Sequence, residues 1–440
     1  MNKFFVLIFA SLLLFSCATS RHFPKKLEKE INRSSVFSGA FTGFVLRDPA
    51  TGKTLCEVNG AKYFTTASNT KLLTLYTCLR TLGDSLPALR WQSDGENLYF
   101  EGTGDPTFLH PVLGKYSPVY QFLRFRPEKN LVFSPYNFDD SRFGNGWAWD
   151  DFGYNFQCER SPMPIYGNRM AVVGKELTVN PPRFRHFLNP TSIGTETAFV
   201  QREELGDRLS ISAKADIPEN FKQEIPIFWG NLDFNLFLKD TLFRPITTPA
   251  KAFFEKLNPR DWQTLFGAPT DTVLRAMMLP SDNFLAEQLL MVCGGKLTDT
   301  LSVGRAIEAS KKKFLADLPD QPRWFDGSGL SRYDLETPRN MAFLLEKIWH
   351  EQPRARVFNL FAAGGLEGTV RDWYKPAPGQ PAWLYAKTGT LGGVHCLSGY
   401  LTARSGKVLV FSFMHNNFKA PSATYKKEME RVLLKIREAY

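Results

Sequence analysis

The feature that most constrains the fold is that the clearest strand patterns stand at the two ends of the chain. Near the start, FTGFVLRDPATGKTLCEVN (41–59) contains two alternating runs around a turn at 48–52, a pattern typical of a hairpin. Near the end, LYAKTGT (384–390), VHCLSGYLTA (394–403) and VLVFSFMHN (408–416) also alternate, separated by short turns. Short turns favour antiparallel pairing. We therefore expect two early and three late strands to share one five-stranded antiparallel sheet.

Helical patterns accompany these strands and suggest that the sheet is flanked by helices. Leucines and a tyrosine recur at a 3.6-residue period after Ser68, and the pattern stops at Gly83. A terminal helix is predicted from about Ser422, with its apolar residues on one face. The sequence thus predicts an α+β fold in which 37–83 and 261–440 form one discontinuous domain.

The stretch between these two parts of the domain, 84–260, has a different composition. It is rich in proline, glycine, asparagine and aromatic residues, with short strand-like runs at 98–102, 131–135, 170–174 and 209–214. We expect it to be a mainly β region inserted into the sheet-and-helix domain.

The N-terminus, MNKFFVLIFASLLLFSC, is typical of an exported protein. Twelve apolar or small residues follow Lys3, too few to span a bilayer comfortably and suited to the core of a signal peptide. We predict a signal peptide at 1–16 and lipidation of Cys17, because 14–17 resembles a bacterial lipoprotein box; ordinary cleavage nearby is the alternative. The polar segment 17–36 is expected to be a tether that includes a short helix. The predicted location is the periplasm or cell envelope, on a membrane.

Composition limits the other classes of function. A hydrophobic content of 43% and a charged content of 22% are ordinary for a folded protein. The net charge of +10 favours an acidic polymer or an anionic membrane face, but no dense basic stripe indicates nucleic-acid binding. The six cysteines form no CxxC pair and the six histidines no HExxH motif, so no metal or other cofactor is predicted.

Ser68-Asn69-Thr70-Lys71 is the first of three elements that could carry chemistry. A serine hydroxyl needs a base to act as a nucleophile, and residues three apart share one face of a helix. Burial at the start of a helix would lower the pKa of Lys71, so that a neutral amine could take the serine proton. The motif alone is weak evidence, because Ser310-Lys311-Lys312-Lys313 also fits it on a probable solvated face.

The other two elements have equally simple structural explanations when each is taken alone. Ser281-Asp282-Asn283 could be only a helix N-cap, or Ser281 could relay a proton while Asn283 orients Lys71 and the substrate. Lys387-Thr388-Gly389-Thr390 could be only a polar strand end. Alternatively, Lys387 and Thr388 could hold a substrate carboxylate, and Gly389 could leave room for a substrate backbone along the strand edge. The N–H groups of Ser68 and Thr390 would then form an oxyanion hole.

The ordered set Ser-x-x-Lys, Ser-x-Asn, Lys-Thr-Gly is far more specific than any one member, and it matches serine penicillin-recognising enzymes. The chain resembles the D-alanyl-D-alanine carboxypeptidase/endopeptidase family of class C penicillin-binding proteins. The resemblance rests on stretches in family order across most of 40–416: ASNTKLLT (67–74), GTGDPTF (102–108), GWAWDD (146–151), SDNFLAEQL (281–289), DGSGLSR (326–332), GGLEGTVR (364–371) and AKTGTLGGV (386–394).

This resemblance implies a transpeptidase/β-lactamase-like fold and a serine peptidase without a cofactor. Ser68 would be acylated, with Lys71 as base and Ser281 and Asn283 as relay and orienter. The substrates implied are peptidoglycan stem peptides ending in D-Ala-D-Ala and possible cross-links, with β-lactams as inhibitors. The chain departs from the family at Thr66, where proline is frequent, and 175–260 matches poorly. The loop at 326–330 is expected to shape the pocket.

Two rival functions share these features. A serine β-lactamase carries the same three motifs, but the long stretch between Ser68 and Ser281 exceeds what a compact lactamase core needs. A catalytically inactive wall-binding lipoprotein is the alternative of another class, and the intact motifs argue against it.

Overall fold

One antiparallel sheet unites the two ends of the chain. The computed structural model describes residues 23–189, 199–212, 217–229 and 234–440; the predicted signal segment 1–16 and Cys17 lie outside them. The strand order is β16-β17-β18-β19-β1-β2, and Phe44 of β1 pairs with Phe413 of β19. The strands are β1 (Phe41–Asp48), β2 (Lys53–Val58), β16 (Ala362–Ala363), β17 (Leu384–Leu391), β18 (Val394–Thr402) and β19 (Val408–Asn416). The five predicted strands are confirmed, and the two-residue β16 was missed because two alanines show no alternation.

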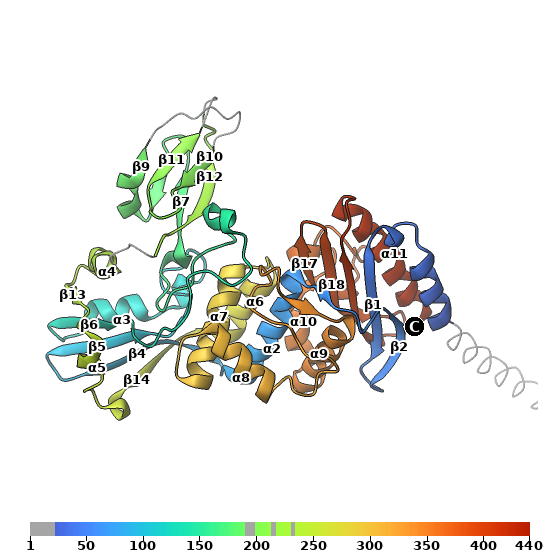
Figure 1. Cartoon of the computed structure of the whole chain (residues 1–440), viewed down its shortest axis with the longest axis horizontal. Helices are drawn as coiled ribbons and strands as arrows, with labels where there is room; N and C mark the ends of the chain where they lie inside the picture. The colour runs from blue at the N-terminus through green and yellow to red at the C-terminus, as the bar shows by residue number, and fades with distance from the viewer. Residues whose placement is uncertain (1–22, 190–198, 213–216, 230–233) are drawn as a thin grey trace, which may run out of the picture.

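Helices cover both faces of this sheet because successive side chains of each strand point to opposite faces. On one face, Phe411 and Phe413 of β19 pack in the same buried cluster as α11 (Ser422–Ala439). On the other face, Val410 and Met414 pack with a group of helices that includes the one after Ser68. Those helices are α2 (Lys71–Thr81), α6 (Thr270–Met278), α7 (Asn283–Thr298), α8 (Val303–Lys313), α9 (Pro338–Glu351) and α10 (Arg354–Leu360). Figure 1 shows the sheet between α11 and the α2, α9 and α10 side.

The segment 17–36, expected to be a tether that includes a short helix, is folded onto the domain from residue 23, where the described structure begins. Residues 23–33 form a helix whose Leu27 and Ile31 are 1% and 2% exposed in the core beneath α11. Its Glu30 forms ion pairs with Arg431 and Lys435 of α11. Burial of the apolar stripe keeps this helix on the domain, whereas a tether would leave it in water.

The inserted region contains a second, mixed sheet with the order β13-β6-β5-β4-β14. Its strands are β4 (Ser85–Ser93), β5 (Asn97–Gly102), β6 (Asn130–Ser134), β13 (Ile246–Thr247) and β14 (Gln263–Pro269). The inserted region also contains three short helices: α3 (Val119–Phe125), α4 (Phe234–Leu242) and α5 (Lys251–Phe254). Because β14 pairs with β4, the β structure of the insert extends past the predicted boundary at 260.

Two small three-stranded sheets complete the insert, and they project from the rest of the molecule in Figure 1. One has the order β12-β7-β8 and the other β10-β11-β9. Their strands are β7 (Arg169–Val173), β8 (Thr178–Asn180), β9 (Leu188–Asn189), β10 (Phe199–Arg202), β11 (Leu209–Ser212) and β12 (Lys222–Pro226). A separate two-stranded pair, β3 (Phe64–Thr65) with β15 (Leu335–Glu336), stands next to the first helix of the catalytic motifs. Within the described part of the chain, no helix is long and apolar enough to cross a bilayer.

Candidate active site

Ser68 lies in a 3-10 turn, η2 (Ala67–Thr70), directly before α2 begins at Lys71. Lys71 is fully buried, and its Nζ lies 3.0 Å from Ser68 Oγ. The same nitrogen donates to Asn283 Oδ1 at 2.6 Å and to the Ser328 carbonyl at 2.7 Å. The first turns of α2 are buried as well, so this Ser-x-x-Lys segment is not a solvated surface helix. The hydroxyl and the amine are within the reach that proton transfer requires.

Burial sets the proton affinity of the Lys71 amine. Removal from water disfavours the ammonium and lowers the pKa of Lys71 to about 8, against the opposing effect of the carboxylates of Asp326, Asp282 and Glu287. About a tenth of the amine is therefore neutral at pH 7 and about half at pH 8, and the neutral form can accept a proton from a hydroxyl.

The segment 281–283 serves as a helix cap and also faces the site. Asp282 is the N-cap of α7, and its side chain accepts a hydrogen bond from the Leu285 N–H at 2.9 Å. Ser281 has a positive φ of 67°, an uncommon conformation for a residue other than glycine. The cap therefore accounts for Asp282 alone, and it leaves Ser281 and Asn283 on either side to contact the two lysines.

Lys387 of β17 contacts Ser281 from a different element. Its Nζ donates to Ser281 Oγ at 2.8 Å and to the Thr388 carbonyl at 2.7 Å. Burial and the charge of Lys71 hold the pKa of Lys387 well below its usual range. In the described part of the chain no carboxylate forms an ion pair with Lys387, so a bound carboxylate would supply the missing counter-charge.

The threonines on either side of Gly389 have side-chain partners from different elements. Thr388 Oγ1 donates to Thr369 Oγ1 at 2.7 Å, and Thr390 Oγ1 lies 3.0 Å from His395 Nδ1. Strand β16 pairs with β17 only at Tyr385 and Ala386. From Lys387 onward, that outer edge of β17 has no strand partner in the described structure.

Gly389 packs closely against the turn that contains Ser68. A Cβ there would lie 2.5 Å from the Thr66 carbonyl oxygen and 3.1 Å from the Ser68 nitrogen. The missing side chain therefore makes room for this turn, and the room expected for a substrate backbone stays a prediction.

The loop at 326–330 contributes through its backbone, which sequence reasoning did not foresee. Asp326 accepts hydrogen bonds from the Gly329 N–H at 2.6 Å, the Ser331 N–H at 2.7 Å and Trp147 Nε1 at 2.8 Å. These bonds hold the loop so that the Ser328 carbonyl reaches Lys71. The Ser328 hydroxyl is fully buried. A motif of side chains gives no sign of a carbonyl contact, although the Gly-Ser-Gly pattern marks a close approach of backbones.

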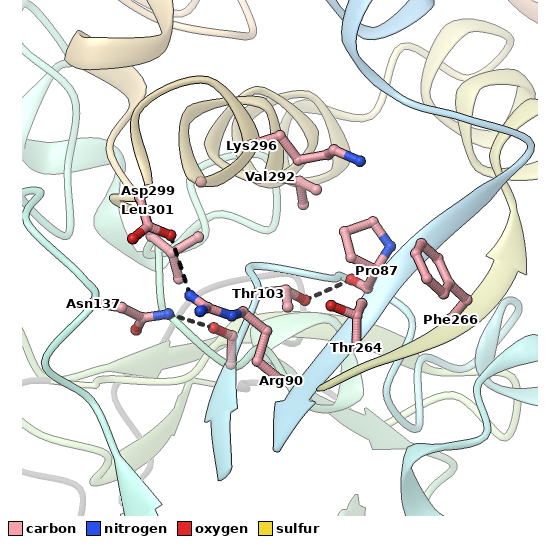
Figure 2. A pocket seen from close by; sticks show the side chains of 12 residues that line it. Pro87, Arg90, Thr103, Asn137, Thr264, Phe266, Val292, Lys296, Asp299 and Leu301 are labelled. Atoms are coloured by element: carbon pink, nitrogen blue, oxygen red, sulfur yellow. Dashed lines mark hydrogen bonds and ion pairs between the residues drawn. The ribbon is translucent and has the colours of Figure 1, made fainter. Parts of the chain in front are cut away.

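Neither a metal-binding cluster nor the cavity at the far end of α7 belongs to this site in the described structure. The described residues contain no cluster of three or more histidine, cysteine or acidic side chains that could hold a metal ion. A cavity of about 190 Å³ lies at the far end of α7, lined among others by Arg90, Lys296 and Asp299 (Figure 2). None of the predicted catalytic residues lines this cavity, so it is separate from the site at the N-terminus of α7.

Comparison with known proteins places this arrangement in a family. The model of the D-Ala-D-Ala carboxypeptidase 3 (S13) family matches residues 24–201 and 259–436. The chain belongs to this family. It is thus a peptidase of the penicillin-binding protein class, and the internal stretch that the model leaves unmatched, 202–258, falls within the segment expected to resemble the family poorly.

Individual relatives agree with this assignment. The D-alanyl-D-alanine carboxypeptidase of Actinomadura sp. (strain R39) is 25% identical, covering 87% of this chain and 79% of that protein. The D-alanyl-D-alanine carboxypeptidase DacB of Haemophilus influenzae is 22% identical, covering 86% of each. The crystal structure of penicillin binding protein 4 from Haemophilus influenzae has a TM-score of 0.74 at 19% identity, covering 94% of this chain and 99% of that one, which establishes the shared fold.

Proposed function

We propose that this S13 family member is a serine DD-peptidase that cleaves the D-Ala-D-Ala bond of peptidoglycan stem peptides through an acyl-enzyme on Ser68. The observation that carries the proposal is the fully buried Lys71 amine, 3.0 Å from Ser68 Oγ, with its pKa lowered to about 8. A buried amine without an ion-pair partner is costly to charge, and at this distance from a hydroxyl it serves as a base.

Acylation begins when neutral Lys71 takes the Ser68 proton as Ser68 Oγ attacks the carbonyl carbon of the penultimate D-alanine. The resulting oxyanion accepts hydrogen bonds from the backbone N–H groups of Ser68 and Thr390. Collapse of the tetrahedral intermediate breaks the C–N bond, and the proton passes by way of Ser281 to the leaving nitrogen. D-Alanine departs, and water hydrolyses the ester to free the Ser68 hydroxyl.

Specificity for a free carboxylate follows from Lys387 and Thr388. Burial makes the Lys387 amine hard to protonate, so a ligand carboxylate that brings a negative charge into the site would stabilise its ammonium form and be bound in turn. The outer edge of β17 beyond Ala386 lets a substrate backbone add as a further strand beside these residues. The same machinery with a larger leaving group would cut D-alanyl–diamino-acid cross-links, and a β-lactam would acylate Ser68 as an inhibitor.

Fluorescent penicillin and a stem peptide ending in D-Ala-D-Ala test this proposal together. The wild-type protein should keep a long-lived label and release D-alanine, whereas Ser68→Ala should do neither. Ser310→Ala is the matched control, because Ser310 begins the second Ser-x-x-Lys sequence and its buried hydroxyl donates only to the Ala306 carbonyl at 2.6 Å. Its labelling should equal that of the wild type.

The rivals predict different results in the same assay. Rapid turnover of penicillin without D-alanine release would indicate a β-lactamase. Neither label nor product would leave an inactive wall-binding lipoprotein. Stoichiometric labelling of Ser68→Ala would overturn the assignment of the nucleophile.

We further propose that the chain is exported through 1–16 and held on a membrane of the cell envelope by lipidated Cys17. In this arrangement 37–83 with 261–440 forms the catalytic domain, apart from β14, and 84–260 forms the insert, whose sheet β14 joins. The predicted signal core and the acidic polymer on which the family acts both support an envelope location. Mass spectrometry of the mature N-terminus tests this: an acylated Cys17 is expected, and an intact Met1 or an unmodified cysteine would contradict it.

A further inference from the structure

Arg169 of the insert contacts the relay segment of the active site from outside. It begins β7, and its guanidinium binds both oxygens of Asp282, with the closer oxygen 3.0 Å from Nη2. The side chains are 16% and 17% exposed, so water screens the pair only partly. The guanidinium also lies 5.7 Å from the ring centroid of Phe284. One side chain of the insert thus holds the residues on both sides of Asn283.

The position of Arg169 is itself tightly determined. Its Nε donates to Cys158 Sγ at 3.0 Å, and its Nη1 lies 3.4 Å from Glu224 of β12. A planar group whose three nitrogens all have a hydrogen-bond partner has little freedom to turn. The guanidinium is therefore a rigid support and not a mobile surface charge.

What Arg169 supports is a strained segment. Ser281 adopts a positive φ of 67°, and Asp282 both caps α7 and accepts from Arg169. A residue in a sparsely populated backbone conformation persists only where its surroundings over-determine it. Asp282 provides that restraint directly after Ser281, and Arg169 fixes Asp282.

The insert makes a second contact with the same segment. Asn283 Nδ2 donates to the Phe156 carbonyl at 3.0 Å, while its Oδ1 accepts from Lys71. Both the amide orientation of Asn283 and the carboxylate orientation of Asp282 are thus set by residues of the insert.

We propose that Arg169 is a positioning residue for acylation, acting through Asp282 to hold Ser281 and Asn283 against Lys387 and Lys71. The proposal rests on the function proposed above and deepens it: the insert completes the active site instead of merely extending the molecule.

Arg169 also balances charge near the base. Three carboxylates raise the proton affinity of Lys71: Asp326 from the loop, Asp282 from the N-cap of α7 and Glu287 from α7 itself; the facing basic group is the Lys387 amine. Two of these carboxylates are paired with arginines of the insert, Asp282 with Arg169 and Glu287 with Arg160. Loss of Arg169 leaves the Asp282 charge unbalanced, which favours the ammonium form of Lys71.

The test is the pH profile of acylation by fluorescent penicillin in Arg169→Gln. We expect the second-order rate constant to fall about ten- to a hundredfold, because small displacements of catalytic groups have effects of this size. The acid limb of the profile should also move to higher pH, since Lys71 must lose its proton at a higher pKa. Arg169→Lys keeps a positive charge, so the acid limb of its pH profile should stay near that of the wild type. Its rate constant for acylation should lie between those of the wild type and Arg169→Gln.

The control is Arg208→Gln, which removes an exposed arginine of the same insert, 65% exposed and paired with Glu203. Its rate and profile should equal those of the wild type. A rate for Arg169→Gln equal to that of this control, or a slower rate with an unmoved acid limb, would overturn the proposal. If Arg169→Gln does not fold, an Arg169→Lys variant that acylates as fast as the wild type would also overturn it.

A double variant shows whether Arg169 acts through Asp282. In an Asp282→Asn background, adding Arg169→Gln should shift the acid limb much less than it does alone. Equal shifts in the two backgrounds would contradict this route. Absence of wild-type labelling would instead refute the proposed function, so the two failures are distinguishable.

Discussion

Gly389→Ala tests how closely the strand of the third motif packs on the turn of the first. An added Cβ would lie 2.5 Å from the Thr66 carbonyl oxygen, 2.9 Å from the Asn69 nitrogen and 3.1 Å from the Ser68 nitrogen. All three atoms belong to the backbone, so no side chain can turn aside. Ordinary contact begins at 3.4 Å, so the closest atom must retreat by 3.4 − 2.5, about 0.9 Å.

A shift of that size moves Ser68 relative to Lys71, whose Nζ is now 3.0 Å away. We expect acylation by fluorescent penicillin to slow about a hundredfold, the usual effect of a displacement near 1 Å. The free energy of unfolding should fall by about 1–3 kcal/mol, as overpacking typically costs. Stopped-flow labelling and denaturant titration measure the two effects.

Gly392→Ala is the matched control three residues further on. A Cβ at Gly392 meets nothing within 4 Å, so the variant should keep both the wild-type rate and stability. If Gly389→Ala behaves like Gly392→Ala, the steric argument is wrong. Unchanged stability with lost release of D-alanine would show that the missing Cβ makes room only for the substrate.

Three further predictions concern protons and one hydrogen bond. Because burial lowers the pKa of Lys71 to about 8 and the base is the neutral amine, acylation by penicillin should rise about tenfold per pH unit below that pH and level off above it; a flat profile from pH 6 to 9 would contradict this. Trp147→Phe removes the 2.8 Å hydrogen bond to Asp326 and should lower the free energy of unfolding by about 1–3 kcal/mol. Trp149 is 74% exposed, so Trp149→Phe should change the free energy of unfolding little. Equal losses for the two variants in denaturant titrations would refute the role of this bond. Burial raises the pKa of Asp105 to about 7, so the folded state binds this proton more tightly than the unfolded chain does. The free energy of unfolding should therefore fall as the pH rises from about 4 to about 7. Asp105→Asn should reduce this fall in denaturant titrations, and an unchanged dependence on pH would exclude Asp105 as its cause.

The parts of the fold that sequence analysis found are those with strong local patterns. Alternation marked β1, β2 and β17 to β19, and the runs at 98–102, 131–135, 170–174 and 209–214 correspond to β5, β6, β7 and β11. Patterns of this kind arise because residues on the buried face of an element are apolar and those on the exposed face are polar. Sequence analysis did not predict that the helix at 23–33 packs on the domain. Charged residues dominate its composition, and only Leu27 and Ile31 are deeply buried.

In the candidate site too, some contacts could be predicted from the sequence and others could not. Ser68, Lys71, Ser281 and Lys387 were singled out by their characteristic spacings, and the structure brings Ser68 to Lys71 and Ser281 to Lys387; their catalytic roles stay predictions. The contacts from Arg169, the Phe156 carbonyl and the Ser328 carbonyl were missed, since neither a backbone oxygen nor an arginine in a distant insert has a pattern that links it to the motifs.

The sequence by itself determined which side chains are the candidates for the chemistry and which strands must come together. Only the tertiary structure decided the proton affinity of Lys71, the support that Arg169 gives to Asp282, and the contact that leaves no room for a Cβ at Gly389. Residue identity and spacing are local properties of the chain. Burial, charge balance and the approach of two backbones are properties of the space around each atom, and distant segments create that space together.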